Sequence, residues 1–463
     1  MGTALIIAYG TSFLASFVLY YGVENSRRIF PLVWVWALMF MLNGYGLIYY
    51  NVSTVSFLPL GVKYDNYVDG AFINWIFVSV WSISYLVGSY YPLKLNTKKT
   101  ERKTTIRRST VWLIKTLIVA SILGNFVFYS LQIPYGYTVF NYKSLPLYEV
   151  FGIIASFRSL LIPSVGAYLI ISPSIRKRNL VSGSAVFSDK ILWTIVGIQA
   201  ILGITLDMQR GDILYPMLAV FIIILARGYL IKVTNIAKYL IVIGIPLMVV
   251  SPLLDQLRRP AVHSKNISYT SIMRAVSEIE NRSAHYSSLL STVTYEPYRK
   301  SILPASTALL RREAKKNGYV YFSTYDSVVL DMVPRFIWEE KPWPLSVSDD
   351  RLGTSSSVAA RNAGQANQVW TIGGGSMYWQ LGWLGVVVGG TIVGLVWGNL
   401  AYRVFTYNNV YAIIVFLSLM SWGLNFVTSI DSFALDLMRL LRVLFPLWLS
   451  DIILHANMKR SNV

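Results

Sequence analysis

Long apolar runs recur throughout this chain, and many of them are long enough to cross a lipid bilayer. A transmembrane helix needs roughly 20 apolar residues. Of the 463 residues, 54% are hydrophobic and only 14% are charged, and the mean hydropathy is +0.50. These values lie far from those of soluble proteins and predict an all-α polytopic membrane protein.

About eleven transmembrane helices are expected from the length of the apolar runs. The expected spans are 4–21, 29–50, 67–90, 111–133, 148–172, 190–207, 213–231, 235–254, 376–401, 409–429 and 433–454. They divide the chain into an N-terminal helical part (1–254, about eight helices), a large, partly helical loop domain (255–375) and a C-terminal helical part (376–463, about three helices).

The formal charge of +19 is explained by its placement in short loops rather than by nucleic-acid binding. Seven Lys and Arg residues fall between Lys94 and Arg108, and four between Arg176 and Lys190. Cytoplasmic loops carry such an excess of positive charge. The N-terminus and the long loop are therefore predicted to face outward.

The absence of cysteine excludes disulfides and Cys-ligated metals. The first outer loop, near Asn51 to Asn66, offers Asp65 but no paired carboxylates for a metal ion. We therefore expect neither a metal nor a cofactor.

Arginines inside the expected spans are candidates for function, because a charge near the bilayer centre usually faces a cavity or a partner. Arg158 and Arg442 have no acidic neighbour at helical spacing, whereas Arg439 follows Asp436 by three residues and could form a structural ion pair. Arg210 lies between Asp207 and Asp212 in a predicted outer turn. It could meet an anionic headgroup or form a salt bridge.

Two helices are expected within the long loop. In the first, Ser271 to Leu290, four polar residues recur at helical spacing, namely Arg274, Glu278, Arg282 and His285. They fit either a solvated helix face or a row that contacts substrate. The second helix, Ser301 to Gly318, is basic toward its end and is expected near anionic lipid headgroups.

A denser pattern follows from Pro334 to Pro342, where Arg335 and Lys341 stand among prolines and aromatic residues. Proline stiffens the backbone, and Trp338 offers a flat apolar face for a sugar ring. After this pattern, Gly373 to Gly375 lead into an aromatic, glycine-containing helix start, Tyr378 to Gly385. Glycines at such spacing are expected to let helices pack closely.

This chain resembles the Wzy-type polymerases of O-antigen repeat units, polytopic GT-C-like glycosyltransferases of the bacterial inner membrane. The resemblance rests on the many spans, on the large loop in the C-terminal half, on Pro334–Pro342 as a Pro-Arg-x-x-Trp-x-x-Lys-Pro pattern, and on Tyr378–Gly385. It implies a periplasmic loop and the polymerisation of undecaprenyl-pyrophosphate-linked oligosaccharides. The implied partners are that lipid-linked substrate, membrane lipids and, as a candidate, a chain-length regulator protein.

Such a transfer needs cations for the pyrophosphate and a base for the attacking hydroxyl. The candidate residues for pyrophosphate and glycan are Arg158, Arg210, Arg274, Arg282, Arg335, Trp338, Lys341, Arg439 and Arg442, and the candidate catalytic bases are Glu280, His285 and Glu339. Two other functions remain open, an O-antigen ligase and a flippase or transporter of lipid-linked oligosaccharide.

Overall fold

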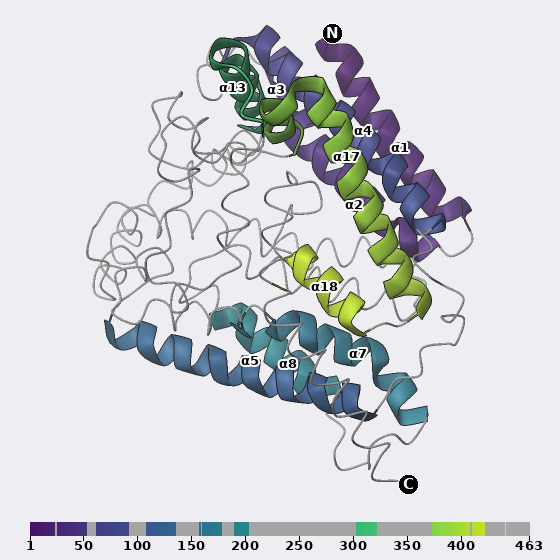
Figure 1. The fold of residues 1–463 in the computed structure, drawn as a ribbon, viewed down its shortest axis with the longest axis vertical. Coiled ribbons are helices and arrows are strands. Elements are labelled where there is room, and N and C mark those ends of the chain that lie inside the picture. Colours follow the sequence, from purple (N-terminus) through teal and green to yellow (C-terminus); the bar gives the residue numbers. More distant parts are fainter. Residues whose placement is uncertain are drawn as a thin grey trace. The chain divides into compact units, whose positions relative to one another are not determined.

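The apolar runs form helices in the computed structural model of the chain, which is drawn in Figure 1. The structure describes residues 1–23, 26–52, 62–91, 108–135, 157–158, 160–177, 189–202, 302–321, 373–407, 410–421 and 440. All regular structure in these residues is helical, without a strand. Five helices among them are long and apolar enough to cross a membrane, namely Gly2–Gly22, Arg27–Ile48, Tyr64–Tyr90, Thr110–Ser130 and Gly374–Thr406.

The chain forms two compact units, each made of separate stretches of sequence. Unit 1 comprises Met1–Lys99, Thr294–Thr406 and Leu424–Met438, and unit 2 comprises Thr100–Val293, Tyr407–Gly423 and Arg439–Val463. The described helices of unit 1 are α1 (Gly2–Gly22), η1 (Ser26–Ile29), α2 (Phe30–Met39), η2 (Phe40–Gly44), α3 (Tyr45–Val52), α4 (Tyr64–Tyr90), α13 (Ile302–Asn317) and α17 (Gly373–Tyr407). Those of unit 2 are α5 (Arg108–Tyr135), α7 (Leu161–Lys177), α8 (Asp189–Leu202) and α18 (Val410–Ser421).

The five long apolar helices coincide with the expected spans 4–21, 29–50, 67–90, 111–133 and 376–401. Three further expected spans correspond to shorter helices, which are α7, α8 and α18. The expected spans 213–231, 235–254 and 433–454 lie outside the described residues, apart from Leu440. Three expectations therefore stay predictions. They are the total of about eleven spans, the outward orientation of the long loop, and the division of the chain into three parts at residues 254 and 375.

The second span is not one regular helix. It begins as the 3₁₀ turn η1, continues as α2 with Pro31 in its first turn, and widens into the π-helix η2 before α3. Proline is tolerated in a first turn because the N–H group it lacks would be unpaired there. A π-helical turn inside an α-helix commonly marks a functional position, and this one carries the fully buried side chain of Asn43.

Polar contacts join α4 to the two helices before it. The Tyr9 hydroxyl donates to the Ala71 carbonyl at 2.8 Å, and the Trp36 Nε1–H group donates to Ser82 Oγ at 3.0 Å. At the end of the helices that is predicted to be cytoplasmic, Arg28 Nη1 donates to the Ser89 carbonyl of α4 at 3.3 Å. These contacts make α4 the central helix of unit 1.

Glycines allow α17 to pack directly on α4. Gly390, Gly394 and Gly398 recur every fourth residue, and a Cβ atom at Gly390 would lie only 3.0 Å from the Phe77 carbonyl oxygen. At Gly394 and Gly398 a Cβ atom would collide with the carbonyls of Trp81 and Tyr85. Small residues at such spacing let transmembrane helices approach closely.

Candidate functional site

The helix α17 contains a sharp break near its beginning. Leu381 (φ −143°, ψ 20°) and Gly382 (φ 62°, ψ −142°) have non-helical backbone angles. After the break the chain runs alongside its own first segment, since a Cβ atom at Gly389 would lie 2.5 Å from Met377 Sδ. Residues twelve apart in a continuous helix would be separated by roughly 18 Å along the axis. α17 is therefore a helical hairpin, with a short arm (Gly373–Gln380) and a long arm (Trp383–Tyr407).

The residues that follow α13 hold this break in place. We call the segment Gly318–Tyr321 the strap. Its Val320 N–H donates to the Trp379 carbonyl and its Tyr321 N–H to the Gln380 carbonyl, both at 3.2 Å. The carbonyls at a helix end need such donors, because they have no partner within the helix.

Three side chains form a buried chain of hydrogen bonds beneath the short arm. Thr307 Oγ1 of α13 donates to Asn74 Oδ1 at 3.0 Å, and Asn74 Nδ2 donates to Asn43 Oδ1 at 3.0 Å. Asn43 Nδ2 then donates to the Met39 carbonyl at 3.3 Å. All three side chains are fully buried. We call them the polar chain, and it fastens α13 to α4 and η2.

The short arm lies against two members of the polar chain. A Cβ atom at Gly374 would lie 2.8 Å from Asn74 Oδ1, and one at Gly375 would lie 2.8 Å from Thr307 Oγ1. Any side chain at either glycine would displace these hydrogen-bonded groups. The run Gly373–Gly375, noted in the sequence as a close-packing element, thus fits against α4 and α13.

An ion pair adds to the contact between α13 and α4. The Arg311 guanidinium is paired with the Asp69 carboxylate, and both side chains are partly exposed. Asp69 lies one turn before Phe72 on α4, so the ion pair and that ring share a face. The expected helix 301–318 is confirmed as α13, and three of its basic residues, Arg312, Lys315 and Lys316, are exposed.

Six aromatic rings form a continuous row around the break. In order of contact they are Trp75 and Phe72 of α4, Trp383 and Tyr378 of α17, and Tyr319 and Tyr321 of the strap. Neighbouring ring centroids lie between 5.5 and 6.4 Å apart. Four of the five contacts are edge-to-face, a favourable geometry for aromatic pairs. We call this set the aromatic row.

Arg158 is the one predicted site residue within the described part of the chain. It lies in unit 2, three residues before α7 begins at Leu161. Its guanidinium lies 4.4 Å from the ring centroid of Phe128 and 5.0 Å from that of Tyr129, both on α5. Such stacking stabilises the cation, and the side chain remains half-buried. Two rings of α5 thus hold the Arg158 guanidinium in place.

The other eleven candidate residues lie outside the described residues. They are Arg210, Arg274, Glu280, Arg282, His285, Arg335, Trp338, Glu339, Lys341, Arg439 and Arg442. Within the described ranges, no group of three or more His, Asp or Glu side chains could hold a metal ion. Independence from metal stays a prediction.

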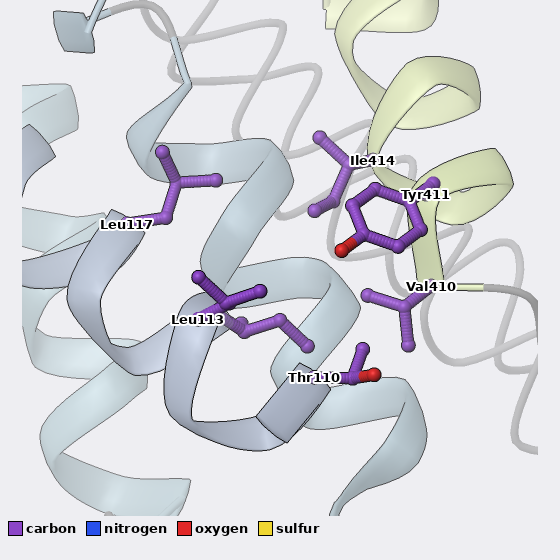
Figure 2. A pocket seen from close by; sticks show the side chains of 7 residues that line it. Thr110, Leu113, Leu117, Val410, Tyr411 and Ile414 are labelled. Carbon is purple, nitrogen blue, oxygen red and sulfur yellow. The ribbon is translucent and has the colours of Figure 1, made fainter. Parts of the chain in front are cut away.

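One hollow in unit 2 is apolar and carries no charged group. The hollow is lined by two helices, with Thr110, Leu113, Ile114 and Leu117 from α5 and Val410, Tyr411 and Ile414 from α18. Figure 2 shows that these side chains approach one another from the two helices. Its lining suits apolar atoms and provides no cation for a phosphate group.

The polar chain and the pairing of Arg311 with Asp69 were not predicted from the sequence. Asn43 and Asn74 lie within expected spans, where buried polar side chains commonly join helices. That signal was available in the sequence. The pairing of Asn74 with Thr307, which is 233 residues away, could not be found from spacing.

Comparisons with known proteins leave the family of this chain open. No protein-family model, no curated protein and no solved structure matches it.

Proposed function

We propose that this chain polymerises lipid-pyrophosphate-linked oligosaccharide repeat units on the outer face of a bacterial inner membrane. The observation that carries the proposal is the pattern Pro334–Pro342, which places Arg335, Trp338 and Lys341 in a long polar stretch between apolar helices. Support comes from the described helices, since five of them are long and apolar enough to cross a membrane.

The proposed reaction joins two lipid-linked glycans. A hydroxyl oxygen of the acceptor repeat unit attacks the anomeric carbon of the donor glycan. The bond from that carbon to the pyrophosphate oxygen breaks, and undecaprenyl pyrophosphate leaves with the bonding electron pair. The hydroxyl proton passes to a base, for which Glu280, His285 and Glu339 are the candidates.

Fixed cations would stabilise the negative charge on the departing pyrophosphate. Arginine suits this task because its planar guanidinium binds phosphate oxygens in pairs and stays charged. We assign Arg335 and Lys341 first, because both belong to the pattern. The other candidate cations are Arg158, Arg210, Arg274, Arg282, Arg439 and Arg442.

The discontinuous helix α17 keeps a flippase or transporter as a second candidate. Transporters often bind their substrate where a helix is interrupted, near the membrane midplane. In α17, however, the break at Leu381 and Gly382 comes only eight residues after the helix begins at Gly373. The long arm is then roughly 37 Å long, enough to cross the hydrocarbon without interruption. This placement favours an enzyme whose site lies outside the spans.

The deciding experiment is deletion of the gene in its host, with surface polysaccharide resolved on a gel. The deletion strain is compared with strains carrying the wild-type gene or Arg335→Ala. A polymerase predicts loss of the ladder with a single repeat unit retained on the acceptor, in both the deletion and the Arg335→Ala strain. Protein level is checked by immunoblot.

The other outcomes identify the alternatives. Loss of all attached units with accumulation of long lipid-linked chains indicates a ligase, and accumulation of single lipid-linked units on the cytoplasmic side indicates a flippase. A normal ladder with Arg335→Ala would remove that residue from the site.

A further inference from the structure

We propose that the aromatic row is a binding site for an oligosaccharide. Its six residues lie outside the charged pattern Pro334–Pro342 in the sequence. The choice of ligand rests on the proposed function, because that function supplies a glycan at this end of the helices.

Three rings of the row are open at the surface and the others support them. Tyr321 is 68% exposed, Trp383 is 44% exposed and Tyr319 is 38% exposed. Tyr378, which contacts both Tyr319 and Trp383, is buried. Tyr319 and Trp383 therefore pack against a buried ring, and Tyr321 packs against Tyr319.

The backbone at Tyr321 adopts a conformation that is rare for a bulky residue. Its φ angle is 46°, and it is the one non-glycine residue with positive φ in the described part of the chain. Bulky residues adopt this conformation rarely, and it persists where the surrounding structure enforces it, often at functional sites. The N–H group of the same residue donates to the Gln380 carbonyl, which ties Tyr321 to the break in α17.

Polar groups accompany the rings, as recognition of a sugar requires. Tyr319 and Tyr378 lie side by side, with ring centroids 6.3 Å apart, and each carries a hydroxyl. Burial raises the pKa of the Tyr319 hydroxyl, and the nearby Tyr378 raises it further. A tyrosine hydroxyl is neutral at physiological pH and can both donate and accept a hydrogen bond. The partly exposed Asp69 and Arg311 side chains lie on the Phe72 side of the row.

These features suit a saccharide better than a lipid. One side of a sugar ring is lined by C–H groups that can pack on an aromatic face, and its edge carries hydroxyls for polar partners. Tyr and Trp rings do gather where a helix meets the membrane surface. Such a belt, however, needs neither a strained tyrosine nor rings on a strap outside the helices, and the row has both.

The test measures binding of the repeat-unit oligosaccharide, cut from the host's own surface polysaccharide, to the full-length protein in lipid nanodiscs. Tyr321→Gly and Trp383→Ala are each expected to weaken binding by about tenfold, the loss of roughly one aromatic stacking contact. Tyr321→Gly removes the ring and also relieves the positive φ, so its thermal midpoint should equal or exceed that of the wild type. Weaker binding in this variant then cannot come from unfolding.

Matched controls use exposed aromatic residues away from the row. Tyr91 is 79% exposed at the other end of α4, and Trp112 is 58% exposed on α5. Tyr91→Ala and Trp112→Ala should bind the oligosaccharide as the wild type does. The inference is overturned if the wild type does not bind, or if Tyr321→Gly and Trp383→Ala bind normally. Normal binding with a lower thermal midpoint for Trp383→Ala would instead identify a lipid-facing belt.

The same strains separate this inference from the proposed function. If deletion abolishes the ladder and leaves a single repeat unit on the acceptor, but the row variants bind normally, the aromatic row is excluded and the polymerase stands. If deletion leaves the ladder intact while the row variants lose binding, the glycan site stands and the polymerase is excluded.

Discussion

At the residue scale, Gly382 and Tyr319 depend on each other. Gly382 has φ 62° and ψ −142°, a region that is favourable only for glycine. A Cβ atom there would lie 2.7 Å from the Tyr319 hydroxyl oxygen. The turn of the α17 hairpin thus requires glycine both for its backbone angles and for the space occupied by the strap.

Gly382→Ala is expected to destabilise the protein by about 1–3 kcal/mol, the usual range for a residue forced into a disfavoured backbone region. The thermal midpoint of purified protein in detergent measures this change. Gly197→Ala is the control, because no atom lies within 4 Å of a Cβ at that helical position, and alanine there should raise stability by roughly 0.5–1 kcal/mol. Equal midpoints for the two variants would contradict the hairpin geometry.

The ion pair between Arg311 and Asp69 should contribute little, because both side chains are partly exposed. A double-mutant cycle with Arg311→Ala, Asp69→Ala and the double variant is expected to give a coupling energy of about 0.2–1 kcal/mol. High salt should reduce this coupling, since exposed charges are screened. A coupling energy that does not change with salt would argue against a solvent-accessible pair.

At the element scale, apolar runs predicted α1, the second span, α4, α5 and the long arm of α17. Their lengths and composition carry that information locally. The hairpin in α17 was not predicted, because apolar residues continue through both of its arms and its glycines were interpreted only as a means of close packing. What fixes the break is the strap, and its pairing with Trp379 and Gln380 joins residues about sixty positions apart. Of the predicted site, only Arg158 can be compared with the structure.

Packing of α17 on α4 should fail when its glycine face is enlarged. In Gly398→Ala the new methyl group would meet the Tyr85 carbonyl and lie 2.8 Å from the Ser89 nitrogen. Both are backbone atoms, which cannot rotate away as a side chain can. Overpacking of this kind costs typically 1–3 kcal/mol, and we expect a lower thermal midpoint than for Gly197→Ala. A thermal midpoint at or above that of the wild type would show that α17 and α4 can move apart without loss of stability.

At the scale of the whole molecule, the predicted odd number of spans places the N-terminus and the C-terminus on opposite sides of the membrane. Each span that is added or removed reverses the side of every later loop. Topology is therefore a sensitive measure of the span count, and in particular of the spans 190–207 and 213–231, which only a short turn separates.

The chain contains no cysteine, so single cysteines can be introduced without removing any. A membrane-impermeant maleimide applied to cells whose outer membrane has been permeabilised should label Thr3→Cys and Ser355→Cys, which are predicted to face outward. Thr100→Cys and Ser461→Cys should react only after the inner membrane is opened, because the excess of Lys and Arg predicts that both are cytoplasmic. Labelling of Ser461→Cys from outside, with Thr100→Cys still protected, would mean an even number of spans. If Ser355→Cys were also protected, the error would lie before the long loop, and the charged pattern at Pro334–Pro342 would face the cytoplasm. A polymerase acting on the outer face would then be excluded.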